Sequence, residues 1–161
     1  MAKFQKFANG IQYASRRSAG LVPATGSTSA GPIRVASIHH GGPVGAAPAT
    51  FAAASARWRS FQHFHMDKGW TDIGYNLGID ARGRLYAGRP IGTLPAAVLG
   101  HNANSVGIVF MQDGRSHPLN LLQRRTLATL FKDGVPEIGL LPLRLLTVRG
   151  HKEFSGHHSN E

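Results

Sequence analysis

Two histidines, His39 and His151, lie at or just after the ends of predicted strands. The apolar run at 33–39 ends on His39, and the run at 143–149 ends two residues before His151. Ligand sites in open α/β sheets form outside the carboxyl ends of the strands, so histidines 112 residues apart can meet there. Imidazole is the commonest protein ligand for zinc, and two rings supply half of a tetrahedral site. A histidine at a strand end is more often a hydrogen-bonded surface or core residue, so the pattern alone leaves both interpretations open.

The pattern of apolar residues predicts strands that alternate with helices between residues 33 and 149. Continuous or alternating apolar runs predict the strands, and stripes at helical spacing predict the helices. We therefore expect a single α/β domain with a mixed central β-sheet flanked by helices. The predicted strands are 33–39, 75–80, 84–89, 105–111 and 143–149, and the predicted helices are 50–66 and 120–132. Asn120 and Gln123 resemble a capping box, and the apolar side of that helix is expected to comprise Leu119, Leu122, Leu127, Leu130 and Phe131.

Composition narrows the chemistry that the chain can perform. Its 161 residues are 42% hydrophobic and 16% charged, and no apolar run approaches the roughly 20 residues that a membrane span needs. The chain has no cysteine, which excludes disulfides, thiol nucleophiles and cysteine-based metal sites within it, so a metal must be held by His, Asp or Glu. A net charge of +10 favours anionic partners.

The positive charge is concentrated near the N-terminus. Residues 1–66 contain seven basic side chains and no carboxylate, since the first acid is Asp67. Residues 1–32 are expected to form a basic N-terminal arm with a small, polar linker at 20–32, followed by the main domain at 33–161. The arm fits a transit peptide, a surface-binding arm or a packed extension. No secretory signal peptide is predicted, so export would need help from another protein.

Several motifs occur in a consistent order after residue 33. They are SIHH at 37–40, SFQHFHMDKGWTDIGYN at 60–76, DARGRLYAGR at 80–89, GHNANSVGI at 100–108 and RGHKEF at 149–154. Together they resemble the zinc-dependent N-acetylmuramoyl-L-alanine amidases, the family shared by peptidoglycan recognition proteins and phage lysozyme-amidases. The resemblance covers 33–161 and implies a mixed sheet, a zinc ion in a groove, and hydrolysis of the amide between N-acetylmuramic acid and L-alanine in peptidoglycan.

The resemblance also assigns roles to residues of this chain. It implies that His39 and His151 bind zinc and that the Tyr75 hydroxyl assists the metal-bound water or the developing oxyanion. An alternative is that Tyr75 only bridges a strand and a loop. Asn76, His101 and Asn102 are expected to contact substrate. For His101 and Asn102 the alternative is that they only hold the loop before the strand at 105.

Two departures from the family pattern concern the site. The third zinc ligand is usually a cysteine in a terminal CPG motif, sometimes an aspartate, about eight to eleven residues after the second histidine, where this chain ends at Glu161. We expect either a longer natural protein or Glu161 as the ligand, and His157 or His158 could also bind. Ala97 stands where many relatives have a histidine that faces the substrate groove, which puts one substrate contact in doubt.

Other side chains have structural interpretations. His65 is expected to be a buried, hydrogen-bonded core histidine, and Trp70 and Asp72 to lock the loop that presents Tyr75. Five arginines are expected to be solvated surface charge, or else to attract anionic wall polymers in a manner that salt weakens. They are Arg82, Arg84, Arg89, Arg124 and Arg125.

Three functions compete on this evidence. The first is a monomeric zinc amidase of the phage or prophage lysin type, which acts on peptidoglycan and the anionic cell-wall surface. Because no signal peptide is predicted, we expect such a protein to be cytoplasmic in the producing cell and to reach the cell wall after lysis or through a holin. The second is a peptidoglycan-binding module of the same fold whose zinc site is incomplete. The third, nucleic-acid binding by the cationic arm, rests on charge alone and lacks a recognised motif.

Overall fold

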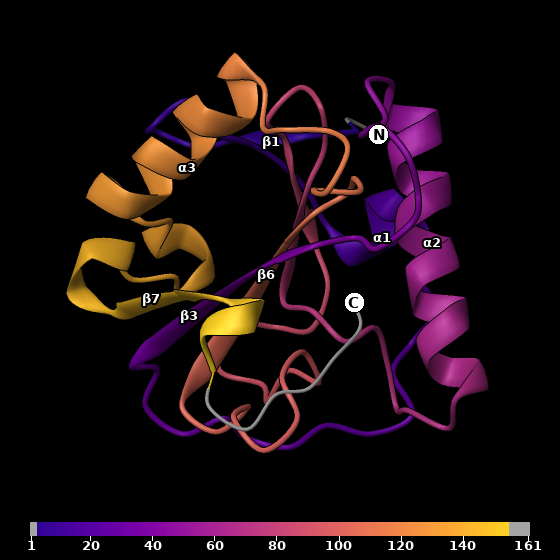
Figure 1. Cartoon of the computed structure of the whole chain (residues 1–161), viewed down its shortest axis with the longest axis vertical. Coiled ribbons are helices and arrows are strands. Elements are labelled where there is room, and N and C mark those ends of the chain that lie inside the picture. The colour runs from indigo at the N-terminus through magenta and orange to yellow at the C-terminus, as the bar shows by residue number, and fades with distance from the viewer. Residues whose placement is uncertain (1–2, 155–161) are drawn as a thin grey trace.

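A seven-stranded mixed sheet runs through residues 3–154, the part of the chain that this computed structural model describes. The strand order is β1-β2-β5-β4-β6-β3-β7, and the central neighbours β4, β6, β3 and β7 are parallel while β5 is antiparallel to β4. The predicted fold class, a single α/β domain with a mixed sheet flanked by helices, is confirmed (Figure 1). The strands are β1 (Gln5–Lys6), β2 (Gln12–Ala14), β3 (Val35–His40), β4 (Leu77–Ile79), β5 (Leu85–Ala87), β6 (Ser105–Phe110) and β7 (Thr147–Gly150).

Each face of the sheet carries its own apolar core. Successive residues of a strand point to opposite faces, and in β6 Ile108 and Phe110 join one core while Val109 joins the other. The first core includes Leu130 of α3 and the second includes Trp58 of α2. Figure 1 shows these two helices on opposite sides of the sheet. The helices are α1 (Arg16–Ala19), α2 (Phe51–Asp67) and α3 (Leu121–Asp133), with short 3-10 turns η1 (Pro136–Ile138), η2 (Leu143–Leu145) and η3 (His151–Glu153).

The long helices begin at side-chain caps. The Thr50 hydroxyl accepts a hydrogen bond from the Ala53 N–H at the start of α2. At the start of α3 the predicted capping box is present, because Asn120 and Gln123 each bond to the backbone of the other. Among the described residues no helix is long and apolar enough to cross a bilayer.

The predicted apolar side of α3 is partly wrong. Leu122 and Phe131 are 38% and 49% exposed, whereas Thr126 is buried beside Leu130. The Thr126 hydroxyl donates to the Gly83 carbonyl at 2.7 Å, in the turn between β4 and β5. A hydrogen bond to that turn therefore fixes the rotation of α3 about its axis, which an apolar pattern alone cannot reveal.

The last predicted strand starts later than expected. Residues 143–145 form η2 after Pro142, with Leu143 buried in the first core, and β7 then occupies Thr147–Gly150. A buried leucine fits either a strand or a 3-10 turn, so the apolar run did not distinguish them.

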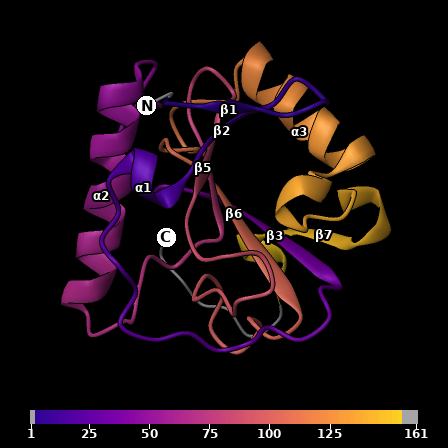
Figure 2. The same cartoon turned by 180° about the vertical axis from the view of Figure 1, so that it is seen from behind.

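The basic N-terminal arm contributes to the same sheet as the main domain. β1 and β2 form a hairpin, and β2 adds to β5 as a parallel strand (Figure 2). Phe7 and Ile11 are 5% and 6% exposed within the first core. The segment at 20–32 forms no long element, but its backbone is hydrogen-bonded to the domain at Thr71, Gly92 and Leu94. The arm and linker are thus packed in this structure.

Candidate active site

The structure brings His39 and His151 together on the α2 side of the sheet. His39 lies near the end of β3, in register with Val109, which belongs to the core under α2. Ile38 of β3 is in register with Gly150, the last residue of the parallel strand β7, so the next residue along the chain from each is one of the two histidines. Their Nδ1 atoms are 2.8 Å apart, and the ring planes are inclined by 81°.

The two imidazoles fit zinc as two of its ligands. A tetrahedral zinc ion with Zn–N bonds of about 2.0–2.1 Å separates neighbouring ligand nitrogens by roughly 3.3 Å. The observed Nδ1 to Nδ1 distance of 2.8 Å is that of a hydrogen bond, and a small outward shift of the rings would open it to the metal-site value. Within residues 3–154 no group of three His, Cys, Asp or Glu side chains could hold a metal. The predicted third ligand, Glu161, lies outside the described residues, as do His157 and His158.

Tyr75 lies beside the histidine pair. Its ring centroid is 5.4 Å from that of His39 and 6.5 Å from that of Phe61 of α2. The Tyr75 carbonyl accepts the Arg89 N–H at 2.9 Å. A Cβ atom at Gly88 would come within 2.2 Å of that carbonyl oxygen, so only glycine allows the strand to approach the loop this closely. This packing fixes the backbone that presents the phenol.

Asp72 is the centre of the loop that leads to Tyr75. Its carboxylate is 2% exposed and accepts hydrogen bonds from Arg16 at 2.7 and 3.1 Å, from Gln62 at 2.7 Å and from the Ile73 N–H at 2.8 Å. The prediction that Asp72 locks this loop is confirmed. Its partners Arg16 and Gln62 were missed, because one lies in the N-terminal arm and the other is a polar residue within a helix.

Replacing Asp72 with alanine is expected to destabilise the protein by about 3 kcal/mol, because it leaves the Arg16 guanidinium and the Gln62 amide without their buried acceptor. Urea unfolding of both proteins measures the difference. Asp113→Ala, which breaks a more exposed ion pair with Arg115, is the matched control and is expected to lose much less. Equal losses in the two variants would contradict the role assigned to Asp72.

His65 of α2 supports the same loop through a hydrogen bond to Gly74. It is 8% exposed, its Nδ1 accepts the Gly74 N–H at 3.1 Å, and its ring stacks on Trp70 at 4.6 Å. The prediction of a buried, hydrogen-bonded histidine is confirmed. Burial, reinforced by the positive charges of Lys68 and Arg89, lowers the pKa of His65 to about 4, so the ring is neutral at pH 7 and can accept the Gly74 hydrogen bond.

The lowered pKa of His65 predicts a loss of stability in acid. The unfolded chain protonates this ring near its ordinary pKa of about 6.5, whereas the folded protein does so only near pH 4. The unfolded state therefore binds more protons in this window, and about 3 kcal/mol of the free energy of unfolding should disappear as the pH falls from 7 to 4. Urea unfolding at both pH values should show a smaller loss for His65→Asn, whose side-chain oxygen can accept the Gly74 N–H. An unchanged pH dependence in that variant, relative to the exposed control His63→Asn, would exclude His65 as the source.

The three residues expected to contact substrate, Asn76, His101 and Asn102, differ in burial and in hydrogen bonding. Asn76 is 1% exposed, its amide donates to the carbonyls of Pro90 and Thr93 at 3.1 and 3.0 Å, and its oxygen accepts the Gly107 N–H at 2.8 Å. The Asn76 side chain is therefore buried and joins the loop at 90–93 to β6, which is a structural role, and its predicted contact with substrate stays a prediction. The Asn102 oxygen accepts the N–H groups of residues 97 and 98, both at 2.9 Å, which agrees with the alternative of a loop-holding role.

His101 lies on the same side of the fold as the end of β7. Its ring is half-buried, 5.4 Å from that of Phe154, which directly follows η3, the turn that begins with His151. Its predicted contact with substrate stays a prediction.

Arg89, expected at the surface, is 8% exposed and donates to the carbonyls of Ile73 and Leu94 at 2.7 and 2.9 Å. It is a structural residue of the loop next to Tyr75, so the prediction of a solvated side chain is wrong.

Comparison with known proteins agrees with this geometry. A family described as N-acetylmuramoyl-L-alanine amidase matches residues 29–160. The chain belongs to this family. Members of the amidase family typically use zinc.

Relatives within the amidase family include recognition proteins as well as amidases. Peptidoglycan-recognition protein SC2 of Drosophila simulans is 34% identical over 128 residues, which are 78% of this chain and 68% of the relative. The human N-acetylmuramoyl-L-alanine amidase is 39% identical over 70 residues, which are 42% of this chain and 12% of the human protein. A solved point mutant of Drosophila PGRP-LB, in complex with tracheal cytotoxin, has a TM-score of 0.77 and 26% identity and covers 90% of this chain and 85% of its own. These relatives are animal proteins and give no support to the predicted phage origin.

Proposed function

We propose that the protein is a zinc-dependent amidase that hydrolyses the bond between N-acetylmuramic acid and L-alanine in peptidoglycan. The observation that carries the proposal is the 2.8 Å approach of the Nδ1 atoms of His39 and His151, beside the ring of Tyr75. Membership of the amidase family supports the reaction, and the complex of PGRP-LB with tracheal cytotoxin, a monomeric peptidoglycan, supports the class of ligand.

The histidines and Tyr75 would divide the chemistry between them. Bound zinc lowers the pKa of a coordinated water to about 7 and polarises a carbonyl oxygen. His39 and His151 would hold the ion through their Nδ1 atoms, with Glu161 as the proposed third ligand. In the reaction, the hydroxyl of water joins the carbonyl carbon, the C–N bond breaks and the alanine nitrogen takes a proton.

Tyr75 would act on the developing negative charge. A phenol hydroxyl that donates a hydrogen bond to the carbonyl oxygen stabilises the tetrahedral oxyanion more strongly than the neutral carbonyl. The loop held by Asp72 and His65 fixes the Tyr75 backbone before substrate binds, so little ordering is needed at the moment of reaction. The half-buried ring, 5.4 Å from that of His39, supports this role for Tyr75.

One observation favours a second function. Within the described residues only two of the proposed ligands converge, as a peptidoglycan-binding module without a complete zinc site would also show. Such a module would use the same face of the sheet and would hold a muropeptide without cleaving it.

A cleavage assay separates the two functions. The protein is incubated with N-acetylmuramyl-L-alanyl-D-isoglutamine, and the released dipeptide is measured by mass spectrometry with zinc, with a chelator, and after zinc is restored. The amidase releases dipeptide, stops with chelator and recovers with zinc. Binding of the muropeptide by the zinc-loaded protein without release of dipeptide would instead establish the binding module.

A further inference from the structure

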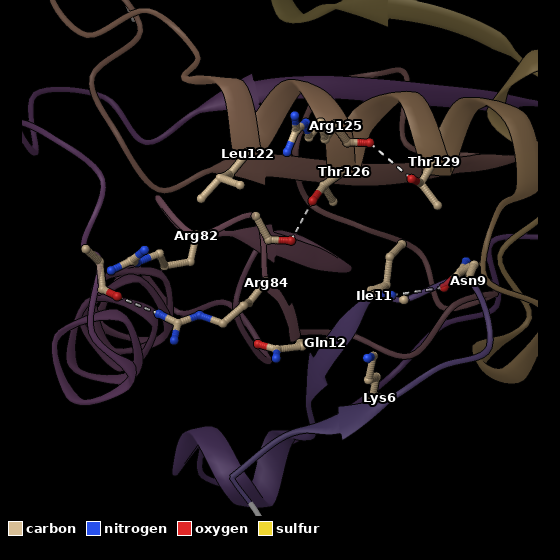
Figure 3. A pocket seen from close by; sticks show the side chains of 13 residues that line it. Lys6, Asn9, Ile11, Gln12, Arg82, Arg84, Leu122, Arg125, Thr126 and Thr129 are labelled. Atoms are coloured by element: carbon tan, nitrogen blue, oxygen red, sulfur yellow. Dashed lines mark hydrogen bonds between the residues drawn. The ribbon is translucent and has the colours of Figure 1, made fainter.

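Positive charge that the proposed function does not use lines a cavity on the α3 side of the sheet. This basic cavity has a volume of about 650 Å³ and is lined by four cationic side chains, Lys6, Arg82, Arg84 and Arg125. They come from β1, from the turn between β4 and β5, and from α3 (Figure 3). No carboxylate is among the described residues that line it.

Three of these cations are available to a ligand. Arg84 is engaged, since it forms an ion pair with the buried Asp80 at 2.6 Å and donates to the Ala49 carbonyl at 2.8 Å. The structure gives no side-chain hydrogen bond or ion pair within residues 3–154 for Lys6, Arg82 or Arg125, and all three are exposed. Like charges gathered without counter-charges repel one another, so an anion bound among them would be stabilised.

The fold holds this basic cavity open between fixed elements. Thr126 of α3 is hydrogen-bonded to the Gly83 carbonyl, and a Cβ atom at Gly83 would lie within 2.4 Å of the Thr126 hydroxyl. Arg82 and Arg125 are therefore carried on a turn and a helix that are held against each other. The volume of the cavity is within the range of about 300 to 1,000 Å³ that small-molecule sites occupy, so it can take more than one phosphate group.

The basic cavity and the histidine pair lie on opposite faces of the sheet. The cavity is lined by α3, which packs on the first core, whereas His39 is in register with Val109 of the core under α2. The two sites share no residue. A polymer bound in the cavity would leave the histidine face accessible to a muropeptide.

We propose that the basic cavity is a second binding site, for successive phosphate groups of an anionic phosphodiester polymer of the bacterial cell wall. The choice of a wall polymer rests on the proposed function, because a wall enzyme meets such polymers where it works. Arginine forks recognise phosphate oxygens in pairs, and separate cations suit successive phosphates along a chain. No aromatic ring lines the cavity among the described residues, so single-stranded nucleic acid would find no stacking surface there.

Fluorescence anisotropy with a labelled glycerol phosphate hexamer tests the proposal. The pocket variant Arg82→Gln/Arg125→Gln removes two exposed cations from the cavity. The control Arg17→Gln/Lys132→Gln removes two exposed cations outside it and gives the same net charge. We expect the pocket variant to bind the hexamer about tenfold more weakly and the control to stay within about twofold of the native protein. Equal losses in both variants, or no loss in the pocket variant, would overturn the site.

Two competitors define the class of ligand. Inorganic phosphate at equal phosphate concentration should displace the hexamer poorly, and a thymidine hexanucleotide should bind more weakly than the glycerol phosphate hexamer. Displacement by inorganic phosphate as efficient as by unlabelled hexamer, or tighter binding of the oligonucleotide, would overturn the assignment to a wall polymer. The probe contains no muramyl amide, so its binding is independent of the proposed hydrolysis, and release of dipeptide from the soluble muropeptide should be unchanged in the pocket variant.

Discussion

Replacing His151 with alanine is expected to reduce zinc content from about one ion per chain to nearly none and to abolish release of dipeptide from the muropeptide. The physical reason is that the ion would lose one of the two imidazoles that approach it through Nδ1, and the remaining ring could not hold it. His39→Ala should have the same effect. Elemental analysis of the dialysed proteins measures the metal independently of activity.

The exposed histidine His63 on α2 supplies the matched control, since His63→Ala removes an imidazole that is remote from the pair. This control should keep both zinc and activity. Circular dichroism of all three variants shows whether the fold is retained. Full zinc retention by a folded His39→Ala or His151→Ala protein would remove that residue from the metal site.

Replacing Tyr75 with phenylalanine is expected to lower kcat about 100-fold or more while leaving zinc content unchanged. The variant keeps the ring that packs beside His39 and Phe61 and loses only the hydroxyl, so the fold and the histidine pair should persist. Removal of one hydrogen-bond donor to an oxyanion commonly costs about 10² to 10³ in kcat. Steady-state kinetics on the soluble muropeptide, with elemental analysis of the same sample, measure both quantities.

The corresponding control is Tyr13→Phe, which removes a hydroxyl on β2, away from the histidine pair. Its kcat should match that of the native protein. If Tyr75→Phe cleaves the muropeptide as fast as this control, the Tyr75 hydroxyl has no part in the reaction and the ring serves only to pack the loop.

The approach of the two histidines could be anticipated from the sequence because it depends on topology. His39 ends the apolar run that forms β3 and His151 directly follows β7, and parallel neighbours bring their carboxyl ends to one edge of a sheet. The start of α3 was predictable for a similar reason, since a capping box uses residues only three positions apart. The histidine pair was predictable from the strand ends, and the start of α3 from a motif of neighbouring residues.

Contacts between distant polar residues could not be anticipated. Arg16 reaches Asp72 across 56 positions, and neither residue type predicts such a partner. Asn76, which follows Tyr75 in the motif, was expected to contact substrate, yet its side chain turns into the fold and bonds to the backbone of Pro90, Thr93 and Gly107. A motif identifies which residues matter, but the direction of each side chain depends on packing that only the structure reveals.

The grouping of cations in the basic cavity also could not be anticipated from the sequence. Arg82, Arg84 and Arg125 were expected to be solvated surface charge or to attract anionic wall polymers, with no sign that they lie together. The turn between β4 and β5 meets α3 and brings them around one space with Lys6. Arg89, from the same motif as Arg82, is instead buried. Net charge alone could not tell which arginines line the cavity and which, like Arg89, are buried.

Anomalous X-ray diffraction at the zinc edge, from crystals of the zinc-loaded protein, tests the central claim most directly. The account predicts one strong peak within about 2.0–2.1 Å of the Nδ1 atoms of both His39 and His151. A fully loaded crystal in which these Nδ1 atoms remain hydrogen-bonded to each other, with zinc bound elsewhere, would contradict it.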